Sequence, residues 1–217
     1  MALFRDRADA GRRLAEKLRR HAGAGGIVLA LPRGGVPVAA EVAKTLGVPL
    51  DVFIVRKLGV PGHAELAMGA IASGGVRVMN TGVVDQLGIP PGRIDAVAAR
   101  EAEELVRRER VYRGERPPLA VRGQRVILVD DGLATGATMR AAVKALRARH
   151  AGRIVVAVPI GAPETCDMLA AEADEVVCAV TPEPFLAVGY WYDDFSQTTD
   201  EEVQAILSRW SSDRRVA

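Results

Sequence analysis

Short runs of apolar residues recur along this chain, each followed by a stretch with the apolar spacing of a helix. The run at 27–31 has no polar residue at all, and 126–129 repeats that pattern. Strands without a polar face are typical of parallel sheets covered on both faces. Alternation of such strands with helices predicts an α/β fold, a mainly parallel sheet with helices on both faces.

The spacing of apolar residues also predicts the order of the strands and helices. Strands are predicted at 27–31, 50–55, 125–129, 154–159 and 175–180, and helices at 5–22, 36–46, 93–110, 138–149 and 163–171. Residues 57–67 read as a loop rich in Gly, Pro and polar groups. Residues 68–72 and 76–79 read as a β-hairpin.

These elements suggest a division of the chain. An α/β core is expected over 24–181, with a helical insertion at about 81–118. Residues 1–23 and 182–217 are expected to pack together as a cap, or hood, over one end of the sheet.

Composition excludes several functions. The 217 residues carry 29 Lys and Arg against 27 Asp and Glu, which gives no reason to expect nucleic acid or a membrane surface as a partner. No apolar stretch reaches the ~20 residues of a membrane span, and a charged N-terminus does not read as a signal peptide, so a cytoplasmic protein is expected. Cys166 and Cys178 are expected to be unpaired, buried and small hydrophobic residues.

An acidic pair and a turn of small residues follow the apolar run at 126–129. Asp130 and Asp131 stand where parallel sheets bind ligands, at the carboxyl end of a strand. The turn at 132–138 then leads into a helix, whose N-terminus and small residues suit a phosphate. The two acids suit hydroxyl groups beside that phosphate. Together they predict a ribose 5-phosphate site; the alternative is an ordinary strand-to-helix turn with solvated acids.

This segment resembles the 5-phosphoribosyl-1-pyrophosphate (PRPP) motif of the type I phosphoribosyltransferases. The resemblance implies that fold, and it implies that Asp130 and Asp131 hold the ribose hydroxyls. It assigns the 5-phosphate to the segment of Ala134, Thr135, Gly136, Ala137 and Thr138. The whole chain is most similar to an uncharacterised branch of phosphoribosyltransferase-like proteins.

The pyrophosphate side is predicted from two other strand ends. Arg33 and Gly34 follow the first core strand; Arg can fork across phosphate oxygens and glycine allows close backbone approach. This turn is similar to the family's first pyrophosphate loop, although a plain turn with an exposed Arg is the alternative. Lys57 is carried over as a second pyrophosphate contact. Together with Asp131, Arg33 and Lys57 are the expected catalytic residues.

Residues 57–75 stand in the place of the family's flexible catalytic loop. Gly59 and Gly62 in this stretch would permit hinge motion. His63 and Glu65 are candidates for ligand contact, with simple exposure as the alternative.

Two features of the sequence point to different acceptor bases. Oxopurine enzymes of the family usually carry an Asp where this chain has Ala134, which favours a likeness to the adenine and orotate enzymes. The tail instead resembles the base-binding segment of oxopurine enzymes, with Phe185, Tyr190 and Asp193 as base-binding candidates. Its aromatic residues could equally form a small core in the cap.

The resemblance implies an enzyme: a glycosyltransferase (pentosyltransferase) that transfers phosphoribose from PRPP to a nitrogenous base, a purine before a pyrimidine, in nucleotide salvage. Mg²⁺ is the expected cofactor; it rides on PRPP oxygens near Asp130 and Asp131, so no dedicated metal cage is needed. A homodimer is left open. The alternative is an inactive PRPP- or nucleotide-sensing module on the same fold.

Overall fold

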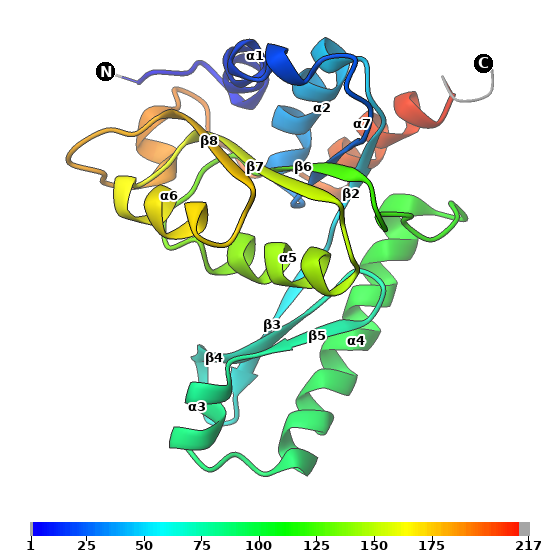
Figure 1. The fold of residues 1–217 in the computed structure, drawn as a ribbon, viewed down its shortest axis with the longest axis vertical. Helices are drawn as coiled ribbons and strands as arrows, with labels where there is room; N and C mark the ends of the chain where they lie inside the picture. The colour runs from blue at the N-terminus through cyan, green and yellow to red at the C-terminus, as the bar shows by residue number, and fades with distance from the viewer. Residues whose placement is uncertain (1, 213–217) are drawn as a thin grey trace.

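A five-stranded parallel sheet forms the centre of the molecule (Figure 1). The computed structural model describes residues 2–212, with only the backbone of residues 64, 65, 211 and 212. The strands lie in the order β2 (Leu50–Val52), β1 (Ile27–Ala30), β6 (Arg125–Val129), β7 (Arg153–Ile160) and β8 (Glu175–Val180). The predicted α/β class is confirmed, and each of these five strands overlaps its predicted run, with β7 one residue longer at each end.

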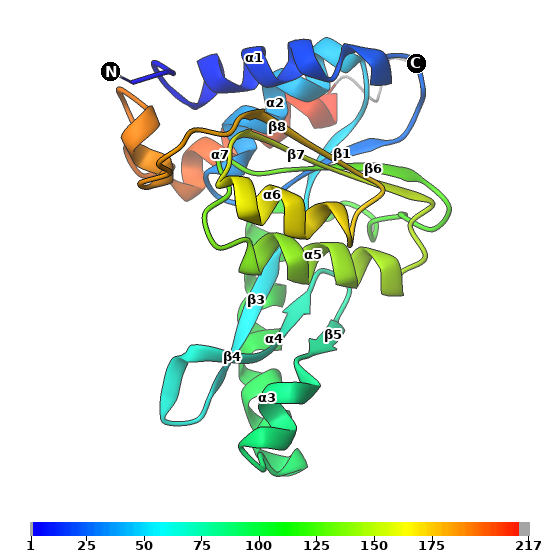
Figure 2. The same ribbon diagram turned by 60° about the vertical axis from the view of Figure 1, so that its left-hand side comes forward.

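Helices cover both faces of this sheet (Figure 2). One face carries α1 (Arg7–Lys17), the short 3₁₀ helix η1 (Arg19–His21) and α2 (Gly35–Leu46); the other carries α5 (Ala137–Ala148) and α6 (Pro163–Ala170). The helix predicted over 5–22 is thus an α-helix followed by a 3₁₀ turn. Because both faces are covered, every residue of β1 is buried.

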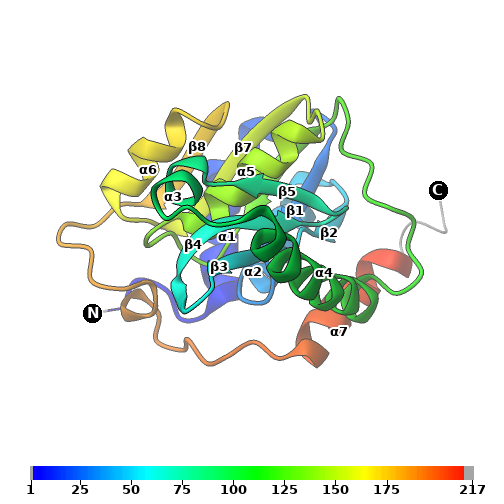
Figure 3. The same cartoon turned by 90° about the horizontal axis from the view of Figure 1, so that it is seen from below.

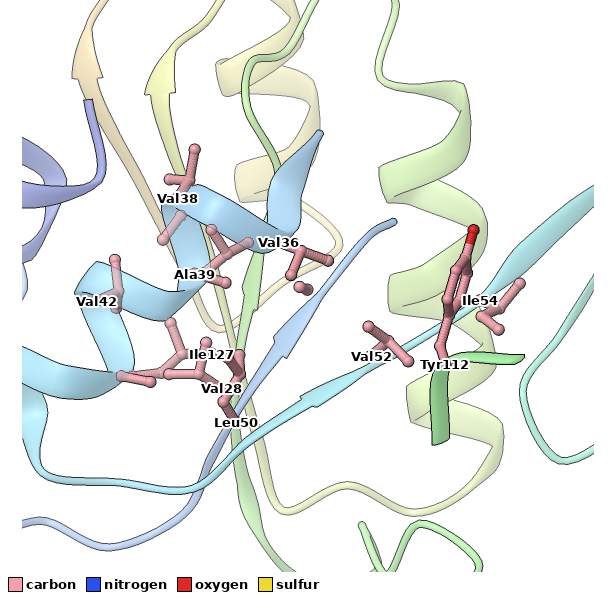
Figure 4. Close-up of a cluster of buried hydrophobic side chains, with 14 of the residues drawn as sticks. Val28, Val36, Val38, Ala39, Val42, Leu50, Val52, Ile54, Tyr112 and Ile127 are labelled. Carbon is pink, nitrogen blue, oxygen red and sulfur yellow. The ribbon is translucent and has the colours of Figure 1, made fainter. Parts of the chain in front are cut away.

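The main core lies between the sheet and α2 (Figure 4). Val28 and Ile127 from neighbouring strands belong to one buried cluster with Val42 of α2, and all three are almost inaccessible to water. Burial of such a side chain stabilises the fold by about 1.5–3 kcal/mol. This packing fixes the carboxyl ends of β1 and β6 side by side.

A second, antiparallel sheet follows β2. It consists of β3 (Val55–Val60), β4 (His63–Ala72) and β5 (Val76–Met79). The predicted hairpin of 68–72 and 76–79 is confirmed, but the loop predicted over 57–67 is wrong, because most of it lies in β3 and β4. Leu58 and Val60 are buried while Lys57 is exposed, an alternation typical of a strand. The glycines concealed that pattern in the sequence.

Two helices accompany the second sheet. These are α3 (Thr81–Gln86) and α4 (Pro91–Arg113), which with the second sheet project from the core (Figure 1). From below, the second sheet lies between α4 and α5 (Figure 3). Two ion pairs hold α4: the buried Glu101 binds Arg56 of β3 at 2.6 Å, and Arg113 binds Asp51 of β2 through two hydrogen bonds. The longest helix, α4, is strongly charged; among residues 2–212 no helix could cross a membrane.

The N-terminal segment and the tail after β8 run together. Phe4 forms a β-bridge with Tyr192, just after the 3₁₀ helix η2 (Val188–Trp191). The last helix, α7 (Asp200–Ser212), packs on α2 and α4. The division into a core of 24–181 and a hood stays a prediction.

The prediction for the two cysteines is wrong. Cys166 of α6 and Cys178 of β8 are joined in a disulfide, where unpaired side chains were expected. The crossover from β7 through α6 to β8 returns the chain over the sheet, which brings the first turn of the helix above the next strand. Both sulfur atoms flank Gly161, where a Cβ would collide with Cys166 Sγ. A separation of 12 residues gave no sign of this in the sequence.

Replacing Arg113 with Ala is expected to lower the free energy of unfolding by about 3–5 kcal/mol, because it leaves the carboxylate of Asp51 buried without its main partner. Denaturant titration measures the change. Arg107→Ala is the matched control, since Arg107 also forms an ion pair on α4 but is exposed. An equal loss in both variants would contradict this account of the Asp51 contact.

Candidate PRPP site

The acidic pair lies where the sequence places it, directly after β6. Both acids are largely buried, with the side chain of Asp131 only 16% exposed, and the backbone N–H of Asp131 donates to Asp130 Oδ1 at 2.9 Å. Burial raises the pKa of Asp130 well above its ordinary value, and the charge of Asp131 raises it further. Burial also raises the pKa of Asp131, while Arg7 opposes that rise. Two carboxylates that repel each other in a dry site are suited to hydroxyl groups, which can donate to both.

The turn after β1 lies against this pair. A Cβ built on Gly34 would overlap Asp131 Oδ2, and one built on Gly35 would lie 2.8 Å from the carbonyl oxygen of Val129. Only glycine permits so close an approach. The sequence predicted the two segments separately as pyrophosphate and ribose contacts, and the structure brings them into contact.

The turn between β6 and α5 has the form of an anion cradle. Gly136 is left-handed, with a φ of 71°, and a Cβ there would meet Thr165. The Thr165 hydroxyl donates to the carbonyl oxygen of Ala134 at 2.6 Å, which fixes the turn. Ala134, Thr135, Ala137 and Thr138 are exposed. The first N–H groups of α5 have no helical partners, so they are available to a phosphate.

Arg7 is a site residue that the sequence analysis did not single out. Its Nε donates to Asp131 Oδ2 at 2.8 Å, and its Nη1 donates to the carbonyl oxygen of Ser196 at 2.7 Å. The guanidinium lies 4.0 Å from the ring centroid of Phe195. One arginine among many on an amphipathic helix gives no sequence signal, because its partner lies 124 residues away.

Arg33 is held from outside the core. Its Nη1 lies 3.6 Å from Asp200 Oδ1 at the start of α7, and the Tyr112 hydroxyl donates to the same oxygen at 2.6 Å. Burial raises the pKa of Tyr112 to about 12, and the hydrogen bond to Asp200 adds to the rise. The Pro32–Arg33 peptide bond is cis. Arg33 remains one-third exposed, so its guanidinium is accessible.

Lys57 lies on the exposed side of β3. It lines a groove of about 360 Å³ together with Thr138 and Lys144, between the second sheet and the start of α5. The structure therefore puts this predicted pyrophosphate contact beside the phosphate turn. His63 is exposed at the start of β4, and the side chain of Glu65 lies outside the described residues.

The predicted base contacts belong to the tail. Phe185 packs into a small core with Phe4 and Tyr192, whereas Tyr190 and Asp193 are exposed. The tail meets the site through a different residue, Tyr192, whose hydroxyl donates to the carbonyl oxygen of Asp131 at 2.6 Å. The base-binding roles of Phe185, Tyr190 and Asp193 stay predictions.

Val188 also joins the tail to the site, because a Cβ on Gly132 would collide with its side chain. Gly132 thus lets the tail close on the turn after β6.

The described residues contain no group of three or more His, Cys, Asp or Glu side chains that could hold a metal ion. The two acids alone do not make a cage. A magnesium ion that arrives on the oxygens of PRPP needs no such cage.

Comparison with known proteins agrees with this geometry. The model of the phosphoribosyl transferase domain matches residues 3–193. A crystal structure of the protein TT1426 from Thermus thermophilus is 46% identical, with a TM-score of 0.86, and the match covers 97% of this chain and 99% of that one.

Among curated proteins, relatives from two Mycobacterium tuberculosis strains, CDC 1551 and H37Rv, are 51% identical over 209 residues. Their names give phosphoribosyl transferase as a provisional assignment. The match covers 96% of this chain and 47% of theirs, so the chain spans about half the length of these relatives.

A uracil phosphoribosyltransferase from Renibacterium salmoninarum is 35% identical over 140 residues, 62% of this chain and 56% of that protein. The domain match and the identity over nearly the whole chain show that this chain belongs to the phosphoribosyl transferase domain family.

Proposed function

We propose that the protein transfers 5-phosphoribose from PRPP to a nitrogenous base and releases pyrophosphate. The observation that supports this most directly is the contact of the Gly34 turn with Asp131. In PRPP the pyrophosphate is attached to C1, beside the 2-hydroxyl. A pyrophosphate loop must therefore touch the groups that hold the ribose hydroxyls, as these two segments do.

Different residues bind different parts of PRPP. Asp130 and Asp131 accept hydrogen bonds from the ribose hydroxyls, and the N–H groups and hydroxyls of the 134–138 turn hold the 5-phosphate. Each charge-assisted hydrogen bond contributes about 1.5–3 kcal/mol. Arg33 and Lys57 would stabilise the negative charge that develops on the departing pyrophosphate.

The chemistry needs positioning more than covalent catalysis. As the C1–O bond breaks, the ribosyl centre becomes cationic, and the carboxylate of Asp131 would stabilise that charge until a base nitrogen attacks. Mg²⁺ carried on PRPP would neutralise the leaving pyrophosphate.

The acceptor is proposed to be a purine before a pyrimidine, on the likeness of the Phe185–Asp193 segment to oxopurine enzymes. The relative named for uracil points toward a pyrimidine. The alternative function is a PRPP- or nucleotide-sensing module on the same fold without catalysis.

The proposal also includes Mg²⁺ as the cofactor, a cytoplasmic location and a homodimer. It includes no nucleic-acid or membrane partner. The even charge balance supports the lack of a nucleic-acid partner. The Cys166–Cys178 disulfide weighs against the cytoplasm, because disulfides are rare there.

A screen of bases tests the activity. The protein is mixed with PRPP and Mg²⁺, each common purine and pyrimidine is added singly, and released pyrophosphate is measured. At least one base should give release above the rate without base. PRPP binding with no release for any base would favour the sensor.

Changing Asp130 and Asp131 together to Ala should abolish measurable PRPP binding by calorimetry, because the ribose hydroxyls lose both acceptors. The melting temperature should fall, because Arg7 is left buried without its partner, so circular dichroism is used to check that the variant still folds. Retained PRPP affinity would contradict the assignment of the ribose site.

Asp130→Asn alone should stabilise the protein at neutral pH. The folded protein raises the pKa of Asp130 above its ordinary 3.8, so it holds a proton that the unfolded chain has released. The wild type therefore loses stability as the pH rises from 3.8 through the folded pKa, and the Asn variant avoids that loss. Melting temperatures from about pH 4 to about pH 8 should show a widening gap between the two proteins. A constant gap would contradict the raised pKa.

A further inference from the structure

Arg7 and Asp131 form an ion pair that is almost closed to water. The arginine side chain is 12% exposed and the aspartate side chain 16%. Removal of a guanidinium from water costs free energy unless its N–H groups find acceptors and its charge is balanced. Arg7 meets both conditions, through Asp131 and through the carbonyl oxygen of Ser196.

Residues of the tail hold Arg7 in place. The ring of Phe195 lies against its guanidinium, at 4.0 Å from the ring centroid, in a cation–π contact. The tail also reaches Asp131, through the hydroxyl of Tyr192 on its carbonyl oxygen. The tail thus fixes both the donor and the acceptor of the ion pair.

The charges around Asp131 make Arg7 necessary there. Asp130, of the same sign, is adjacent; Tyr192 is a buried, neutral phenol; and Asp194, exposed on the tail, interacts with the charge of Arg7. Arg33, from the turn after β1, pairs with Asp200. Within residues 2–212, Arg7 is the only basic side chain that forms an ion pair with either acid.

We propose that Arg7 is a positioning residue of the PRPP site, which acts through Asp131: it supplies the counter-ion of that carboxylate and orients it toward the Gly34 turn. This inference rests on the proposed function. Arg7 donates its hydrogen bond to Oδ2 of Asp131. Because a carboxylate can accept about four hydrogen bonds over its two oxygens, Oδ1 can still accept one from a ribose hydroxyl. Packing of the tail on α1 and binding of ribose are thereby coupled.

The test compares PRPP affinity in three proteins over about pH 6–8: the wild type, Arg7→Gln and Arg13→Gln. Arg13 is the matched control, because it lies on the same helix, contacts the ring of Phe4 and pairs with Asp9, yet touches neither acid. Without the cation, the pKa of Asp131 rises further and the carboxyl takes up a proton at a higher pH. PRPP itself titrates in this range, so the ratio of each variant to the wild type is measured.

Arg7→Gln should lose about tenfold in PRPP affinity, the size of one charge-assisted hydrogen bond, and the loss should be greater at the acid end of the range than at the alkaline end. Arg13→Gln should match the wild type at every pH. Arg7→Lys should recover part of the loss, because an ammonium restores the charge without the second donor. Melting temperatures report whether each variant folds.

Equal affinity of Arg7→Gln and the wild type across the range would overturn the inference, and so would a loss that does not depend on pH and is not recovered by Lys. If Arg7→Gln does not fold, Arg7→Lys is decisive: it must bind PRPP more weakly than Arg13→Gln. If the wild type does not bind PRPP, the proposed function fails first.

Discussion

Burial of two adjacent carboxylates at the end of β6 is the constraint on which the rest of the site depends. Asp130 and Asp131 repel each other in a place that water reaches poorly. Such a pair persists only where the surrounding structure fixes it. Here the parallel sheet supplies the rigid support, the Gly34 turn closes one side, and Arg7 balances one charge.

The sequence predicted the parts of the structure that depend on local order. The strand at 125–129 and the acids after it follow from an apolar run and the residues next to it, and the carboxyl ends of parallel strands meet at one edge. The contact of the Gly34 turn with Asp131 follows from that rule, because β1 and β6 are neighbours in the sheet.

Contacts between distant segments were not predictable in the same way. Arg7 reaches Asp131 only because the tail folds back along the N-terminal segment, and nothing in the spacing of α1 marks that arginine. The Cys166–Cys178 bridge likewise depends on how far the α6 crossover turns. In β3, an irregular register and Gly59 hid a strand whose buried and exposed residues alternate.

The pairing of Phe4 with Tyr192 has a consequence for the order in which the protein is assembled. A ribosome releases the sheet strands, the acids and the phosphate turn before it releases residues 192–196, which fix Arg7. A nascent chain that already contains the whole parallel sheet therefore still lacks the fixed counter-ion of Asp131. The contacts that fix α1 beside Asp131 therefore form after those of the parallel sheet.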